Sequence, residues 1–146
     1  MVNYNMESFK EYTEKNEKAV SFDFDDTIYM LNWLDEENDF ERDAYNVPIG
    51  RLNKRIAAKI KQYSQDGYLV YVITSRYDIW KEDTETFLKD NDLLQYIENV
   101  IFTNGAWKAN TCKRMGVSVH YDDDIKELKR LRYKNIVPVR VKHENI

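Results

Sequence analysis

The fold of this chain is decided by a short apolar run that ends in three carboxylates and a hydroxyl: Ala19-Val20-Ser21-Phe22-Asp23-Phe24-Asp25-Asp26-Thr27. A buried strand cannot hold this much uncompensated charge, because an unpaired carboxylate in a core is expelled, neutralised or bound to a cation. We therefore expect a strand over residues 19–24 with its acids at the C-terminal end, where open α/β sheets bind ligands. Asp23 and Asp25 are two residues apart and face one side of extended backbone, which suggests a divalent metal site or an acid/base pair.

The length of 146 residues suits one domain, residues 1–146, around a single core. The formal net charge of −4 hides an uneven distribution, since residues 1–47 carry a net charge of −9 and residues 48–146 one of +5. This balance argues against a long nonspecific nucleic-acid surface, but it is compatible with a nucleotide or a short strand end. The sequence has no apolar run of membrane-spanning length and no signal-peptide pattern, so we expect a cytoplasmic protein that binds no membrane.

Apolar and amphipathic segments alternate along the chain, which predicts an α/β fold with a mainly parallel sheet and helices on both faces. Strands are expected at residues 19–24, 68–73, 100–102, 117–121 and 136–141. The last belongs at a sheet edge, because Pro138 lacks a ladder donor. Helices are expected within residues 1–18, from Pro48 to Asp66-Gly67, and at 82–90, 107–115 and from 125 onward. Residues 28–47 lack a sustained period and are expected to form a loop or small hairpin over the end of the first strand.

Polar side chains follow four of the expected strands, close to where each strand ends. They are Asp23, Asp25 and Thr27 after the first, Thr74, Ser75 and Arg76 after the second, Lys108 soon after the third, and Asp122 and Asp123 after the fourth. In a parallel sheet these ends share one edge, so carboxylates from two strands, a hydroxyl and an ammonium are expected to meet in one crevice.

The order and spacing of these residues resemble the haloacid dehalogenase superfamily of phosphohydrolases over about residues 19–141. The four motifs of that superfamily are Asp-x-Asp-x-Thr, an apolar run ending in Thr or Ser, a Lys, and an apolar run ending in Asp-Asp. The resemblance implies a Rossmann-like three-layer sandwich with a minimal cap. It also implies that the backbone carbonyl of Asp25, rather than its side chain, is a metal ligand.

A phosphoryl group repels an attacking carboxylate unless a divalent cation neutralises both. We expect Asp23 to attack phosphorus and form an aspartyl phosphate, and Asp25 to protonate the leaving oxygen and later deprotonate water. Thr74 and Lys108 would stabilise charge on the phosphoryl group. Oxygen-only ligands favour Mg²⁺ as the cofactor. Its expected ligands are Asp23, Asp25, Asp122 and Asp123.

Neither insertion between the motifs is long enough for a full cap domain, which predicts an open site for a large substrate contacted by Thr27, Ser75 and Arg76. The second motif resembles the phosphatase domain of phage-type polynucleotide kinase/3′-phosphatases, whose phosphate-binding Arg matches Arg76 and whose Gly is replaced by Ser75. This resemblance implies a nucleotide or polynucleotide 3′-phosphate end as the substrate. The alternatives are a 5′(3′)-(deoxy)ribonucleotide monophosphatase, an enzyme for another phosphorylated small molecule, and a non-catalytic metal-binding module.

Some of these residues also have purely structural interpretations. The acidic run after the first strand could cap a helix or hold a structural ion, and Asp124 could replace one member of the metal pair. His120 is expected to pack beneath the site, and Cys112 to fill a helix face. Three tryptophans could stack on a base but are individually more typical of a core or rim: Trp33, Trp80 and Trp107.

Overall fold

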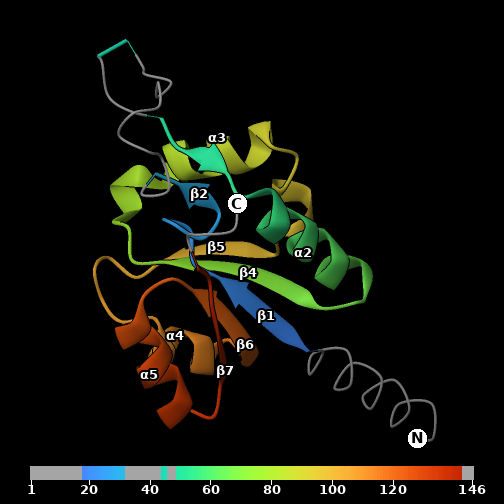
Figure 1. Ribbon diagram of the computed structural model, residues 1–146, viewed down its shortest axis with the longest axis vertical. Helices are drawn as coiled ribbons and strands as arrows, with labels where there is room; N and C mark the ends of the chain where they lie inside the picture. The colour runs from blue at the N-terminus through green and yellow to red at the C-terminus, as the bar shows by residue number, and fades with distance from the viewer. Residues whose placement is uncertain (1–17, 32–43, 46–48, 143–146) are drawn as a thin grey trace, which may run out of the picture.

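The computed structural model describes residues 18–31, 44–45 and 49–142. Its main feature is a five-stranded sheet in the order β5-β4-β1-β6-β7, in which every neighbouring pair is parallel (Figure 1). The strands are β1 (Ala19–Phe22), β4 (Leu69–Thr74), β5 (Asn99–Phe102), β6 (Val117–Asp122) and β7 (Val137–Arg140). The predicted α/β class, the five strands and the edge position of the last strand are confirmed.

Helices cover both faces of the sheet and complete three layers (Figure 1). On one face, α2 (Lys54–Gln65) and α3 (Lys81–Asp90) pack over a core that includes Phe22 and Val72. On the other, α4 (Ala109–Arg114) and α5 (Ile125–Tyr133) pack around Ile73 and Cys112. The central strands β1 and β4 between them are buried almost throughout, as expected for a parallel sheet that is covered on both faces.

The prediction that a helix follows Pro48 directly was wrong at its start. Residues Arg51–Leu52 form β3, which pairs antiparallel with β2 (Tyr29–Met30), and α2 begins only at Lys54. Asn53 caps the helix, because its side-chain oxygen accepts hydrogen bonds from the backbone N–H groups of the second and third helical residues. Leu52 continues the apolar helical period, so periodicity alone hides this cap.

Of residues 28–47, which were expected to form a loop or hairpin, the structure describes 28–31 and 44–45; β2 lies in this segment, and its partner β3 lies beyond it. Position 50, directly before β3, is a glycine because the ring of Tyr29 packs against its backbone. A Cβ at this position would lie 2.5 Å from the nearest atom of that ring. Residues 32–43 and 46–48 lie outside the described residues, as do residues 1–17 of the expected N-terminal helix. Every helix in the described ranges is too short or too polar to cross a bilayer.

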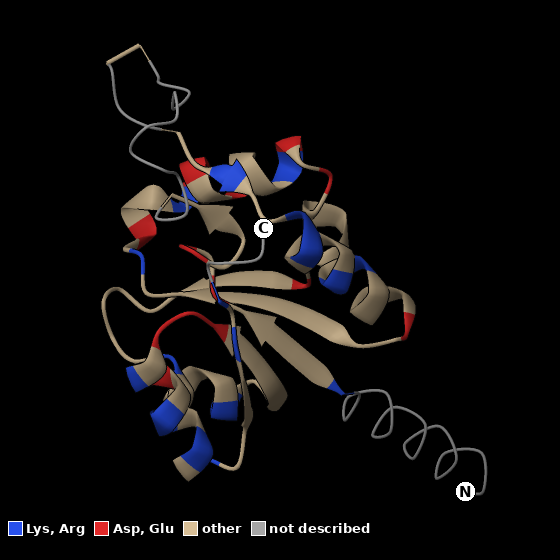
Figure 2. Ribbon diagram, viewed as in Figure 1, with Lys and Arg blue, Asp and Glu red and all other residues tan. Residues whose placement is uncertain are grey.

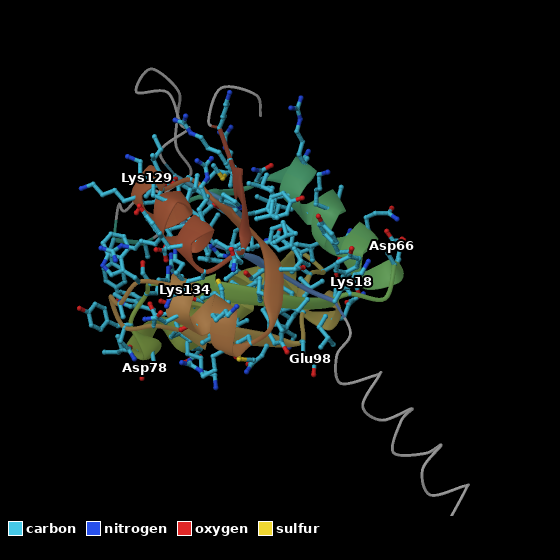
Figure 3. All side chains as sticks on the ribbon, turned by 90° about the horizontal axis from the view of Figure 1, so that it is seen from below. Lys18, Asp66, Asp78, Glu98, Lys129 and Lys134 are labelled. Atoms are coloured by element: carbon cyan, nitrogen blue, oxygen red, sulfur yellow. The ribbon has the colours of Figure 1, made fainter. Side chains whose placement is uncertain are left out.

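The parallel sheet brings the ends of its strands to one edge. Figure 3 shows Lys18 and Glu98, which precede β1 and β5, at one end of the molecule, and Asp78, which follows β4, at the opposite end. Asp23 directly follows β1, and its backbone N–H still donates to the carbonyl of Tyr121 in β6 at 2.8 Å. The acids after β1 and the acids after β6 are therefore neighbours.

Candidate active site

Lys108 joins the acids of the two strands. Its Nζ donates to Oδ1 of Asp23 at 2.9 Å and to Oδ2 of Asp122 at 2.8 Å, and all three side chains are buried. Burial acts to lower the pKa of Lys108, but the two carboxylates outweigh it, and the pKa lies above its ordinary value. Lys108 therefore stays protonated and neutralises part of the acidic cluster.

One ammonium does not balance the negative charge around it. Asp23, Asp122 and Asp123 each offer a carboxylate oxygen, and these atoms lie within 4.8 Å of one another. Burial raises the pKa of Asp23 well above its usual range, and the charge of Asp122 adds to this effect. Burial also raises the pKa of Asp123 to about 6. Uncompensated charge on three converging carboxylate oxygens fits a hard divalent cation such as Mg²⁺.

Asp122 differs from its two neighbours because it is held ionised. Burial acts to raise its pKa, but the hydrogen bond from His120 and the charge of Lys108 outweigh it and hold the pKa of Asp122 well below its usual range. Its second oxygen accepts the backbone N–H of Asp124 at 3.0 Å.

Asp124 itself caps α5 through its side chain. Among the described residues, the group of converging acids contains Asp122 and Asp123 but not Asp124. Figure 2 shows acidic residues in red at the end of β6 and on the loop that follows it.

Asp25 is not one of the three converging acids and forms a bidentate ion pair with Arg76. Nε and one terminal nitrogen of the guanidinium donate to its two carboxylate oxygens at 2.9 and 2.8 Å. The guanidinium lies over the rings of Phe24 and Tyr29, at 4.6 and 5.4 Å from their centroids. The side chain of Asp25 is 47% exposed, so its carboxylate can meet a bound molecule.

Two of the three hydroxyl residues named from the sequence, Thr27 and Ser75, lie beside the acids. Thr27 donates to Oδ2 of Asp23 at 3.3 Å. Thr74 is buried at the end of β4 and lines neither pocket of the site; its oxygen accepts the backbone N–H of Arg76 at 3.2 Å. Ser75 is exposed and lines an acidic pocket of about 520 Å³ together with Asp23, Lys108 and the acids after β6.

Two contacts at the site were not expected from the sequence. His120 is fully buried beneath the site, as expected, but its Nε2 also lies 2.8 Å from Oδ2 of Asp122, and its Nδ1 lies 2.6 Å from the hydroxyl of Ser21. Glu127 is buried and accepts the backbone N–H of Lys108, which holds the start of α4. The two-residue spacing of His120 and Asp122 on one strand face is the signal that could have revealed the first contact.

Magnesium binding is expected to weaken as the pH falls through about 6. Because the pKa of Asp123 in the folded protein is about 6, protons compete for its oxygen below that pH, and the raised pKa of Asp23 acts in the same direction. Because this pKa is raised in the folded protein, the ionised Asp123 carboxylate lowers the free energy of unfolding above about pH 6. A bound cation removes this loss of stability. The increase in melting temperature caused by Mg²⁺ should therefore be large at about pH 7.5 and small at about pH 5. Equal increases at both pH values would contradict the assignment of these acids.

The comparisons with solved structures agree with this architecture. A chain of the Pnkp1/Rnl/Hen1 RNA repair complex matches with a TM-score of 0.63 and 25% identity over 89% of this chain. The N-terminal part of protein BF1531 from Bacteroides fragilis, which contains a phosphatase domain complexed with Mg, matches with a TM-score of 0.61 and 16% identity over 91% of this chain. A Had-superfamily hydrolase from Ehrlichia chaffeensis matches with a TM-score of 0.56 and 9% identity, over 84% of this chain and 86% of its own.

The chain spans 44% of the matched chain of the RNA repair complex and 38% of the Bacteroides protein. No protein-family model and no curated protein matches the sequence.

Proposed function

We propose that this chain, whose fold is that of the haloacid dehalogenase superfamily of phosphatases, is a Mg²⁺-dependent phosphomonoesterase. The observation that carries the proposal is the placement of Lys108 between Asp23 and Asp122, two acids from different strands, with Asp123 beside them. A structural ion site would need the carboxylates but not a buried ammonium that already occupies two of them. A carboxylate nucleophile that attacks a negatively charged phosphoryl group needs both the metal-binding carboxylates and the ammonium.

Each residue has a part in phosphoryl transfer. Mg²⁺ held by Asp23, Asp122 and Asp123, with the backbone carbonyl of Asp25, would neutralise the charge of the phosphoryl group. Asp23 attacks phosphorus and forms an aspartyl phosphate while the ester oxygen leaves. Lys108 opposes the effect of burial and favours the ionised form of Asp23. It also stabilises the charge that develops on the phosphoryl oxygens, to which the hydroxyl of Thr74 would donate.

Asp25 acts as the acid and base of this reaction. It protonates the leaving oxygen and later takes a proton from the water that hydrolyses the aspartyl phosphate. In the free protein both of its oxygens accept hydrogen bonds from Arg76. An arriving phosphoryl group offers Arg76 a second bidentate partner, so substrate binding would release Asp25 for proton transfer.

We assign the substrate as a nucleotide or a polynucleotide 3′-phosphate end. The acidic pocket opens directly to the surface beside the exposed Ser75, so the described residues leave room for a large leaving group. Arg76 stands where the second motif of polynucleotide 3′-phosphatases has its phosphate-binding Arg. The similarity to a chain of an RNA repair complex supports the same substrate class. The second candidate is a 5′(3′)-(deoxy)ribonucleotide monophosphatase, which is favoured by the three acids Asp25, Asp83 and Asp90 that line a neighbouring pocket.

A substrate panel with and without chelator tests this function. With Mg²⁺, the full chain should release phosphate from a 3′-phosphorylated oligonucleotide or a nucleoside 3′-monophosphate. Excess chelator should lower the rate by at least about 100-fold, and added Mg²⁺ should restore it. Activity that persists in chelator would contradict the role of the metal. A preference for sugar phosphates over every nucleotide would contradict the substrate class, and the absence of turnover with all esters would favour a non-catalytic module.

A further inference from the structure

A second and larger pocket adjoins the acidic one. It measures about 810 Å³, within the range of pockets that bind small molecules. Asp25 and Ser75 line both pockets, so the second one begins where the phosphoryl site ends. Its floor is aromatic and includes Phe24, Tyr29 and Phe87. The ring of Tyr29 meets that of Phe87 edge-on at 4.9 Å, where Figure 1 shows β2 beside α3.

The outer rim of this second pocket carries two aromatic side chains that are open to solvent. Tyr77 is 59% exposed and Trp80 is 52% exposed. Exposed aromatic rings next to a site for charged ligands are typical of surfaces on which a planar group stacks. The rim is also held in place, because Asn104 accepts the backbone N–H of Asp78 at 2.8 Å.

One buried hydroxyl ties the rim to Arg76. Thr84 donates to the backbone carbonyl of Trp80 at 2.8 Å and accepts a hydrogen bond from the guanidinium of Arg76 at 3.1 Å. The exposed ring and the group that is to contact phosphate are thus positioned by the same side chain of α3.

The charged residues of the second pocket restrict the net charge of the ligand that it can bind. Asp25, Asp83 and Asp90 line it, against the single guanidinium of Arg76. Asp83 and Asp90 lie seven residues apart on one side of α3, which places acids about 10 Å apart along the helix. An occupant with further phosphate groups would be repelled by these walls, whereas a neutral one would not.

The geometry points to the second pocket as the binding site for the leaving group, and to that leaving group as one uncharged nucleoside whose base stacks on Trp80. This inference rests on the proposed phosphatase function. The aromatic rim lies beyond the residues that the two pockets share, so the planar group of the ligand is separated from its phosphoryl group by a spacer. A ribose provides such a spacer, whereas an aryl phosphate such as phosphotyrosine carries its ring directly on the ester oxygen.

The test compares Trp80→Ala with the wild type on a nucleoside 3′-monophosphate, glycerol phosphate and phenyl phosphate. Loss of one stacking contact should raise KM for the nucleotide at least about fivefold more than KM for glycerol phosphate. Trp80→Phe, which keeps an aromatic face, should recover most of the difference. Trp107→Ala is the matched control, because Trp107 is similarly exposed but lies against Arg130, with the guanidinium 3.9 Å from its ring centroid, and lines neither pocket.

Three results would overturn the inference. They are an equal change in KM for nucleotide and glycerol phosphate, a change for phenyl phosphate as large as that for the nucleotide, and tighter binding of a nucleoside 3′,5′-bisphosphate than of the 3′-monophosphate. In each case phosphatase activity remains measurable. Failure of the proposed function would instead appear as no turnover of any of the three esters by the wild type.

Discussion

Replacing Asp23 with Asn is expected to lower turnover of every phosphate ester by at least about 10⁴-fold, because the amide cannot attack phosphorus to form an acyl phosphate. Folding should survive this change. Burial and the charge of Asp122 already disfavour the ionised form of Asp23, so a neutral side chain of the same shape relieves a penalty in the metal-free protein. Single-turnover phosphate release and the melting temperature without metal are the two measurements.

Asp26→Asn is the matched control for this substitution. Asp26 lines the same acidic pocket, and its side chain accepts the backbone N–H of Leu31 at 3.1 Å, a bond that an Asn oxygen can keep. Asn also tolerates the left-handed backbone of this position, whose φ is 59°. Activity within a few-fold of the wild type is expected for this control. If Asp23→Asn retained comparable activity, Asp23 would not be the nucleophile.

The placement of the acids could be predicted because each follows an apolar run too short and too hydrophobic to contain it. Asp23 and Asp122 had to lie at strand ends, and a parallel sheet brings those ends together. The start of α2 could not be predicted in the same way. Leu52 satisfies both a helical period and an antiparallel pair, and only the capping contacts of Asn53 decide between them.

The pairing of Asp25 with Arg76 depends on strand register, which the sequence does not show. Phe22 lies opposite Val72 in the β1–β4 pair, and Asp25 and Arg76 follow the C-terminal ends of these two neighbouring strands. Ser21 lies opposite His120 in the β1–β6 pair, after a register shift between Ala19 and Val20. Without that shift the hydroxyl of Ser21 would face a different residue of β6. Apolar strands of similar composition permit several registers, and packing in the folded protein selects one.

Lys108→Met is expected to impair both catalysis and stability, and Mg²⁺ should separate the two effects. Loss of the ammonium removes the only cation that contacts Asp23 among the hydrogen bonds and ion pairs of the described residues. Removing one partner of a buried ion pair costs about 3–5 kcal/mol of unfolding free energy. Turnover should fall by about 100- to 1,000-fold, as when one group that stabilises transition-state charge is lost.

Because a divalent cation can replace the lost positive charge, added Mg²⁺ should raise the melting temperature of Lys108→Met more than that of the wild type, while turnover stays low. Lys113→Met is the control, on the helix that begins directly after Lys108, since Lys113 is exposed and its hydrogen bond within the described part of the chain is to the carbonyl of Lys134 at 3.4 Å. Lys113→Met should change turnover and the melting temperature only slightly. Recovery of full turnover by Lys108→Met in Mg²⁺ would show that Lys108 only compensates charge in the metal-free protein. If Lys108→Met is stable and binds the metal but turns over slowly, the ammonium of Lys108 in the wild type must act on the reacting phosphoryl group.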